Sequence, residues 1–155
     1  MANKILSPYI IDTLQKSISD TMITSICPNK DQLAEALSLQ SDELSALTER
    51  ELSKYIYTLS QYIVYLQVQC NSRHIKYLES KRRYELALAK GSISIEAKTL
   101  KEKARIALSN DPELQKYEKI LRITEADYML FEKIPESVTE LVNALKKELS
   151  IRIGR

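Results

Sequence analysis

The sequence predicts an all-α protein, an elongated helical hairpin or bundle built around one long helix. Residues 48–90 contain neither glycine nor proline, and apolar residues recur at helical spacing through most of the chain. The whole chain has only two glycines and four prolines for turns and linkers. No stretch alternates between apolar and polar residues as a strand would. We therefore expect helices joined by short connections.

The first part of the chain is expected to form a helical arm of its own. Ser7 followed by Pro8 fits an N-cap and the first position of a helix, and apolar residues then recur at helical spacing. A short second helix is predicted over residues 31–39. We accordingly divide the chain into an N-terminal helical arm, residues 1–47, and a long-helix core, residues 48–155.

The long helix is predicted to run from about residue 49 to residue 90. Thr48 and Glu51 form a T-x-x-E capping box directly before it, in which a hydroxyl and a carboxylate satisfy free backbone amides. Gly91 would end the helix in a left-handed conformation. At about 1.5 Å per residue, such a helix spans roughly 60 Å.

Three further helices are expected after the long one. Apolar periodicity resumes at Ile93 and predicts a helix that continues to Leu108. The sequence Asn110-Asp111-Pro112 ends that helix and caps the next. A break at Pro135 precedes a final amphipathic helix, which we expect to serve assembly.

Apolar residues in the first half of the long helix step alternately by four and three, which is the spacing of a coiled-coil seam. A hairpin of helices with such narrow seams leaves apolar surface uncovered in one chain, and burying that surface favours self-association. We therefore predict a homo-oligomer. The residues predicted to form its interface are Leu52, Ile56, Leu59, Ile63 and Leu66 on the long helix and Leu141, Leu145 and Leu149 on the final helix.

Positive charge is concentrated in the middle third of the chain. Residues 73–105 carry ten Lys or Arg against four Asp or Glu, whereas residues 1–72 carry five against eight and residues 106–155 carry eight against nine. A phosphate backbone is the natural complement of such a segment. The residues predicted to bind nucleic acid are Arg73, Lys76, Lys81, Arg82, Arg83 and Lys90.

Two tyrosines, Tyr77 and Tyr84, interleave with these cations at a spacing of seven. Tyrosine rings stack on unpaired bases in many single-strand binders, so both are candidates for base stacking. The alternative stays open, because the two tyrosines also continue the apolar seam and would then be core residues. An alternative is open for the six cations too, because a run of charged residues on a long helix is usually only a solvent-exposed face.

No catalytic motif is present. His74 is the single histidine and belongs to no cluster of metal ligands, and the chain has no glycine-rich phosphate loop. Cys27 and Cys70 form no paired motif, so we expect no metal, no cofactor and no disulfide. The longest apolar run, residues 62–66, is too short to cross a membrane, and no signal peptide is recognisable. A soluble, cytoplasmic, non-enzymatic protein is expected.

Several short stretches occur in an order that is found in a known family. They are Tyr65-Leu66, Lys81-Arg82-Arg83, Leu86-Ala87-Leu88-Ala89 before a glycine turn, Lys101-Glu102-Lys103-Ala104, Leu108-Ser109-Asn110-Asp111, and Ala144-Leu145-Lys146 in the final helix. In this order and character, residues 48–153 resemble the UvsY-like recombination mediators of tailed phages.

The resemblance implies an all-helical protein that assembles into rings, binds single-stranded DNA weakly and helps to load a RecA-like recombinase onto DNA covered by single-strand-binding protein. It also implies that residues 81–83 lie in the DNA-binding region. We therefore predict a recombination mediator-like accessory protein whose partners are single-stranded DNA, the recombinase, the single-strand-binding protein and further copies of itself. The alternative is a structural or adaptor protein, such as a virion component or an assembly chaperone, whose long helix contacts only other proteins.

Overall fold

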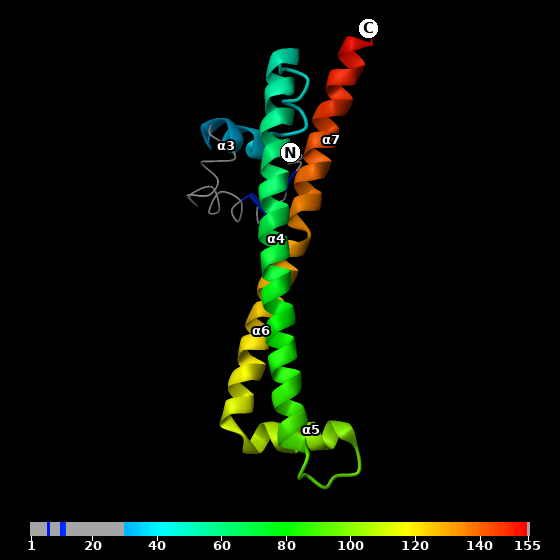
Figure 1. Cartoon of the computed structure of the whole chain (residues 1–155). Helices are drawn as coiled ribbons and strands as arrows, with labels where there is room; N and C mark the ends of the chain where they lie inside the picture. The colour runs from blue at the N-terminus through cyan, green and yellow to red at the C-terminus, as the bar shows by residue number, and fades with distance from the viewer. Residues whose placement is uncertain (1–5, 7–9, 12–29, 155) are drawn as a thin grey trace. The chain divides into compact units, whose positions relative to one another are not determined.

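The structure, a computed structural model, describes residues 6, 10–11 and 30–154 (Figure 1). Every regular element among them is an α-helix, and the all-α prediction, the long helix and the C-terminal helix are confirmed. Apart from residues 10 and 11, the predicted first helix lies outside the described residues. The helices are α3 (Lys30–Ser38), α4 (Glu49–Ser92), α5 (Leu100–Asn110), α6 (Pro112–Glu132) and α7 (Ile134–Ile153).

The long helix α4 begins where the capping box predicts. The Thr48 hydroxyl accepts a hydrogen bond from the Glu51 backbone amide at 3.2 Å, and the Glu51 carboxylate accepts one from the Thr48 amide at 2.7 Å. These bonds to Thr48 favour the ionised carboxylate, so they hold the pKa of Glu51 below its usual value. The local sequence alone is enough to start this helix.

The predicted left-handed stop at Gly91 is wrong. Gly91 lies inside α4, and no described glycine has a positive φ. The helix ends one residue later with bonds of its own, because the Ser92 hydroxyl donates to the Leu88 carbonyl at 2.6 Å and the Ile93 amide approaches the Lys90 carbonyl at 3.4 Å. These bonds satisfy carbonyls that a left-handed cap would otherwise satisfy.

The helix predicted from Ile93 begins later, at Leu100. Thr99 takes an extended conformation, and its hydroxyl accepts a hydrogen bond from the Glu102 amide at 3.1 Å. Thr99 and Glu102 thus present the same T-x-x-E pattern as the start of α4, and they set the boundary of α5. By contrast, the predicted break at Pro135 is confirmed, because α6 ends at Glu132 and α7 has this proline in its first turn.

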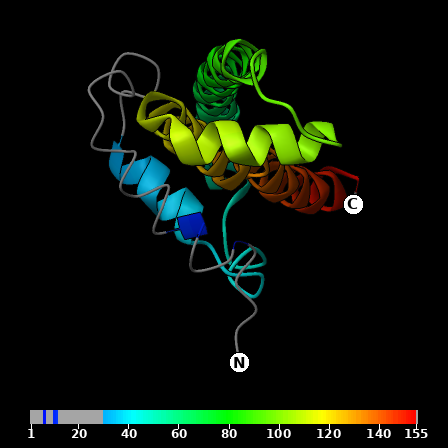
Figure 2. The ribbon, with the colours of Figure 1, turned by 90° about the horizontal axis from the view of Figure 1, so that it is seen from below.

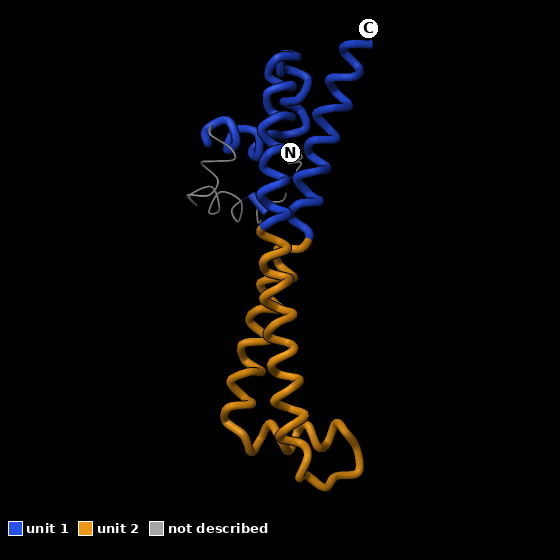
Figure 3. Tube along the Cα trace, in the orientation of Figure 1, with its two compact units in different colours: residues 1–68, 133–155 blue, residues 69–132 orange. Residues whose placement is uncertain are grey.

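The chain is divided into two compact units (Figure 3). Unit 1 contains residues 1–68 and 133–155, and unit 2 contains residues 69–132. This division falls within α4 and again between α6 and α7, not at residue 48. The first half of α4 is therefore grouped with α3 and α7, and the second half with α5 and α6.

Unit 1 buries apolar side chains from three helices. They are Leu33, Ala36 and Leu37 of α3, Leu52, Leu59, Tyr62, Tyr65 and Leu66 of α4, and Ile134, Val138, Leu141, Val142 and Leu145 of α7. Arg152 adds polar contacts, because its guanidinium donates to the backbone carbonyls of Leu47, of Leu44 at 2.8 Å and of Ser45 at 3.0 Å. These bonds tie the end of α7 to the turns that precede α4.

The seam predicted to mediate self-association lies largely in this core. Ile56, Ile63 and Leu149 are half-buried. The other five predicted interface residues, Leu52, Leu59, Leu66, Leu141 and Leu145, are buried within a single chain. The coiled-coil spacing thus marks a surface that packs against other helices, and helices of the same chain cover most of it. The homo-oligomer stays a prediction, and an interface between copies would have to use exposed apolar residues other than these five.

Candidate nucleic-acid interface

Most of the predicted nucleic-acid-binding residues lie in unit 2, which is a helical hairpin. The second half of α4 runs antiparallel to α6, since Arg73 pairs with Asp127 near one end while Gly91 and Asp111 line a common cleft near the other. The short helix α5 crosses the closed end of this hairpin (Figures 1 and 2). Its Ala107 is buried beside Gly91. The hairpin therefore presents one length of α4 and one length of α6 side by side.

Rings and polar groups fill the contact between α4 and α6. His74 stacks on Tyr128 with ring centroids 4.6 Å apart, and Tyr77 stacks on the same ring at 5.9 Å. The Tyr77 hydroxyl also donates a hydrogen bond to the Glu125 carboxylate at 3.4 Å. Aromatic stacking at these distances stabilises the pairing of the two helices.

The two tyrosines predicted to stack on bases both face this contact. Tyr77 is occupied by its stacking partners on the protein. Tyr84 is half-buried, and burial together with the nearby Glu118 carboxylate raises the pKa of its hydroxyl above the usual value. The placement of both rings fits the alternative that assigned them to the seam.

Arg73 is also engaged within the hairpin. Its Nε atom lies 3.3 Å from Oδ2 of Asp127, and its guanidinium carbon lies 4.1 Å from the centroid of the Phe131 ring. A further bond joins the guanidinium to the Gln69 side chain at 3.1 Å. A phosphate would have to compete with these three partners, so Arg73 is the least available of the six predicted cations.

The other five predicted cations are exposed, but they do not share one face. Lys76, Arg83 and Lys90 follow one another at steps of seven and fall on one line along α4, which we call the α4 cationic line. At about 100° per residue, Arg82 points roughly 100° away from Arg83, and Lys81 about 200°. No carboxylate of the described residues forms an ion pair with a member of the α4 cationic line.

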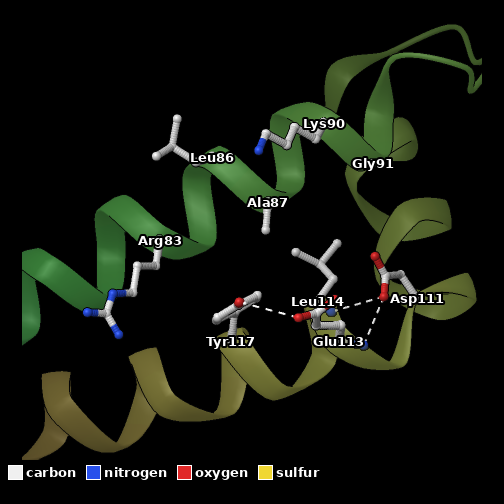
Figure 4. Close-up of a pocket in the computed structure, with 9 residues that line it drawn as sticks. All are labelled: Arg83, Leu86, Ala87, Lys90, Gly91, Asp111, Glu113, Leu114 and Tyr117. Atoms are coloured by element: carbon white, nitrogen blue, oxygen red, sulfur yellow. Dashed lines mark hydrogen bonds between the residues drawn. The ribbon is translucent and has the colours of Figure 1, made fainter.

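Two members of this line border a cleft between α4 and α6 (Figure 4). The cleft has a volume of about 400 Å³, and Arg83 and Lys90 stand on its α4 side. The ring of Tyr117 projects into it from α6. Small side chains leave this space open, since Ala87 and Gly91 are the α4 residues opposite α6 here. The cleft therefore combines two cations with one aromatic ring.

Two carboxylates lie at the end of the cleft, and both are bound by groups of the protein. Oδ1 of Asp111 accepts hydrogen bonds from the backbone amides of Glu113 at 2.8 Å and Leu114 at 3.2 Å, which caps the start of α6. The Glu113 carboxylate accepts a bond from the Tyr117 hydroxyl at 3.4 Å. These acids make the end of the cleft beside Gly91, called its inner end, unfavourable for a phosphate.

Tyr117 is not among the residues predicted from the sequence to bind nucleic acid. The residue belongs to α6, which begins more than twenty residues after Lys90, and it approaches Arg83 only because α4 and α6 pair antiparallel. The sequence shows a tyrosine at this position, but it does not show that Arg83 and Lys90 lie near it. A prediction of the hairpin register would have found it.

Other chemical features of the described residues are few. No group of three or more His, Cys, Asp or Glu side chains among them could hold a metal ion. Burial raises the pKa of the Cys70 thiol, and the nearby Glu132 carboxylate adds to the rise, so the reactive thiolate is disfavoured. None of the helices described is long and apolar enough to cross a membrane.

Comparison with protein-family models, with curated proteins and with solved structures finds no match for this chain. The resemblance to the UvsY-like mediators stays a prediction from the sequence.

Proposed function

We propose that this protein binds single-stranded nucleic acid, and single-stranded DNA first of all, through unit 2. The observation that carries the proposal is the α4 cationic line, in which Lys76, Arg83 and Lys90 are exposed at regular steps without a carboxylate partner among the described residues. Each cation that neutralises a phosphate releases a counterion, which makes binding favourable at low salt.

Within this proposal, the cleft beside the line receives one unpaired base. The phosphates on either side of that base contact Arg83 and Lys90, while the neutral base stacks on the Tyr117 ring. Asp111 and Glu113 repel a phosphate from the inner end, so that the backbone stays outside and the base enters. A base held in a duplex is already paired and stacked, and it cannot enter in this way.

The wider role that we propose is that of a recombination mediator-like accessory protein, which acts as a homo-oligomer and helps to load a RecA-like recombinase onto single-stranded DNA covered by single-strand-binding protein. Its support is the family resemblance of residues 48–153 together with the α4 cationic line. The proposal includes no catalytic step and no cofactor.

A structural or adaptor function is the second candidate, and the exposed apolar side chains of unit 2 favour it. Ile75 and Leu86 on α4 and Ile123 on α6 are each more than half exposed. Such side chains suit contacts with other proteins. This candidate predicts no measurable binding to nucleic acid, so binding experiments separate the two.

Tyr117→Ala is expected to weaken binding to a single-stranded oligonucleotide by roughly tenfold, because stacking of one base on an aromatic ring is lost. Binding of the wild type to a duplex of the same sequence is expected to be weaker, and the substitution is expected to change it little. Fluorescence anisotropy with labelled oligonucleotides measures both affinities at one low salt concentration.

Tyr57→Ala is the matched control. Tyr57 is 66% exposed on the first half of α4, away from the basic segment, and its substitution should leave both affinities unchanged. Equal single-strand affinities for the wild type and Tyr117→Ala would refute the proposed role of the cleft.

A further inference from the structure

Unit 2 exposes more large apolar side chains than it buries. The buried apolar residues of unit 2 are Ala107, Leu114 and Phe131, whereas Ile75, Leu78, Leu86, Ile93, Leu100, Ile120, Ile123, Met129 and Leu130 are exposed. Single apolar residues are common on protein surfaces, but contiguous groups usually mark an interaction site. A contiguous group requires several of these residues to line up on one helix face.

The outer side of α6 carries such a group. Its members, at successive steps of four, three, four and three, are Lys116, Ile120, Ile123, Asp127 and Leu130, and we call this group the α6 outer seam. The three aliphatic side chains are 40%, 59% and 58% exposed. Two residues that face α4, Leu114 and Glu125, lie about half a turn around α6 from Ile123.

The charges along this seam are distributed unequally. Lys116 and Lys119 lie in the first half of α6, and Asp127 lies in the second half. A second α6 in parallel orientation would place equal charges beside each other at every level. An antiparallel second α6 would place the lysines of each helix near the aspartate of the other, which is favourable.

We propose that α6 pairs with α6 of a second copy of this chain, antiparallel, about a twofold axis at Ile123. In this register Ile123 meets its equivalent, Lys119 faces Asp127 of the second copy, and Lys116 lies beside Leu130 of the second copy. Asp127 has an exposed fraction of 58% in its side chain beside Arg73, so it can accept a second cation. The opposed helix dipoles also favour this orientation.

This pairing rests on the homo-oligomer of the proposed function and not on nucleic-acid binding. It covers the aliphatic residues of the α6 outer seam in both copies. The α4 cationic line lies on the other helix of the hairpin, so it stays accessible to a nucleic acid in the paired state.

Disulfide cross-linking in the full chain tests the pairing. With Cys27 and Cys70 replaced by serine, Ile123→Cys is expected to form a covalent dimer under mild oxidation, because position 123 meets itself on the axis. Position 120 of one copy lies about 9 Å along the axis from position 120 of the other. That offset exceeds the Cα separation of a disulfide, so Ile120→Cys should cross-link at least about tenfold more slowly.

A mixture provides an independent check of orientation. Lys116→Cys and Leu130→Cys should each cross-link poorly alone and readily when the two variants are mixed in equal amounts. Failure of Ile123→Cys to cross-link, or equal cross-linking of Ile120→Cys, would overturn the pairing.

Analytical ultracentrifugation of the wild type distinguishes a failure of the predicted homo-oligomer from a failure of this α6 pairing alone. A monomer at micromolar concentration would contradict the homo-oligomer and this pairing together. An oligomer in which Ile123→Cys does not cross-link would contradict this pairing alone and leave the proposed function standing.

Discussion

Reversal of the α4 cationic line, by Lys76→Glu, Arg83→Glu and Lys90→Glu together, is expected to reduce the affinity for single-stranded DNA by about 100-fold or more at low salt. Unit 2 carries 13 Lys or Arg against 10 Asp or Glu, and the three substitutions change these numbers to 10 against 13. The phosphate backbone then meets repulsion where it met attraction. Fluorescence anisotropy with a labelled oligonucleotide gives the affinities.

A second triple reversal controls for total charge. Lys133, Lys146 and Lys147 are exposed in unit 1, and their replacement by glutamate changes the net charge of the chain by the same amount. This variant should lose far less affinity than the reversed α4 line. An equal loss in both variants would show that the charge of the whole protein, and not this line, determines binding. Circular dichroism should show the same helix content in all three proteins, because every substituted side chain is exposed.

Leu145→Ala is expected to lower the free energy of unfolding by about 2–5 kcal/mol, since Leu145 is fully buried in unit 1 and its truncation leaves a cavity. Urea unfolding followed by circular dichroism measures this change. Ile153→Ala is the control on the same helix. Ile153 is 70% exposed, and its substitution should cost much less.

The same variant distinguishes a core role for Leu145 from the interface role that sequence analysis assigned to it. A core residue affects the stability of each chain and leaves the mass of the folded oligomer unchanged. If sedimentation showed a smaller folded species with unchanged stability per chain, Leu145 would belong to an interface between copies.

The helices could be predicted well because their boundaries are encoded locally. The capping box at Thr48 and the proline positions of α6 and α7 determine where these helices start. The errors in helix boundaries arose because the same residue type can occur either at a helix end or elsewhere in the structure. Gly91 was interpreted as a left-handed stop but continues the helix, and Thr99 was overlooked as a cap.

The candidate site could be predicted only in part, because which helices pair determines which cations are free to contact a phosphate. The steps of seven that join Lys76, Arg83 and Lys90 are visible in the sequence. The engagement of Arg73 by Asp127 and the position of Tyr117 beside Arg83 depend on the register of two helices that are distant in sequence. A seam of leucines likewise shows that a helix has a neighbour, but it does not show whether that neighbour belongs to the same chain.

The salt dependence of binding tests the role of the α4 cationic line most directly. Affinities for one single-stranded oligonucleotide are measured over a range of salt concentrations for the wild type and for a variant with Lys76, Arg83 and Lys90 all replaced by alanine. Each phosphate contact on a single strand contributes about 0.7 to the slope of log affinity against log salt, so the slope of the variant should be smaller in magnitude by about 2. Equal slopes for the two proteins would contradict phosphate binding by this line.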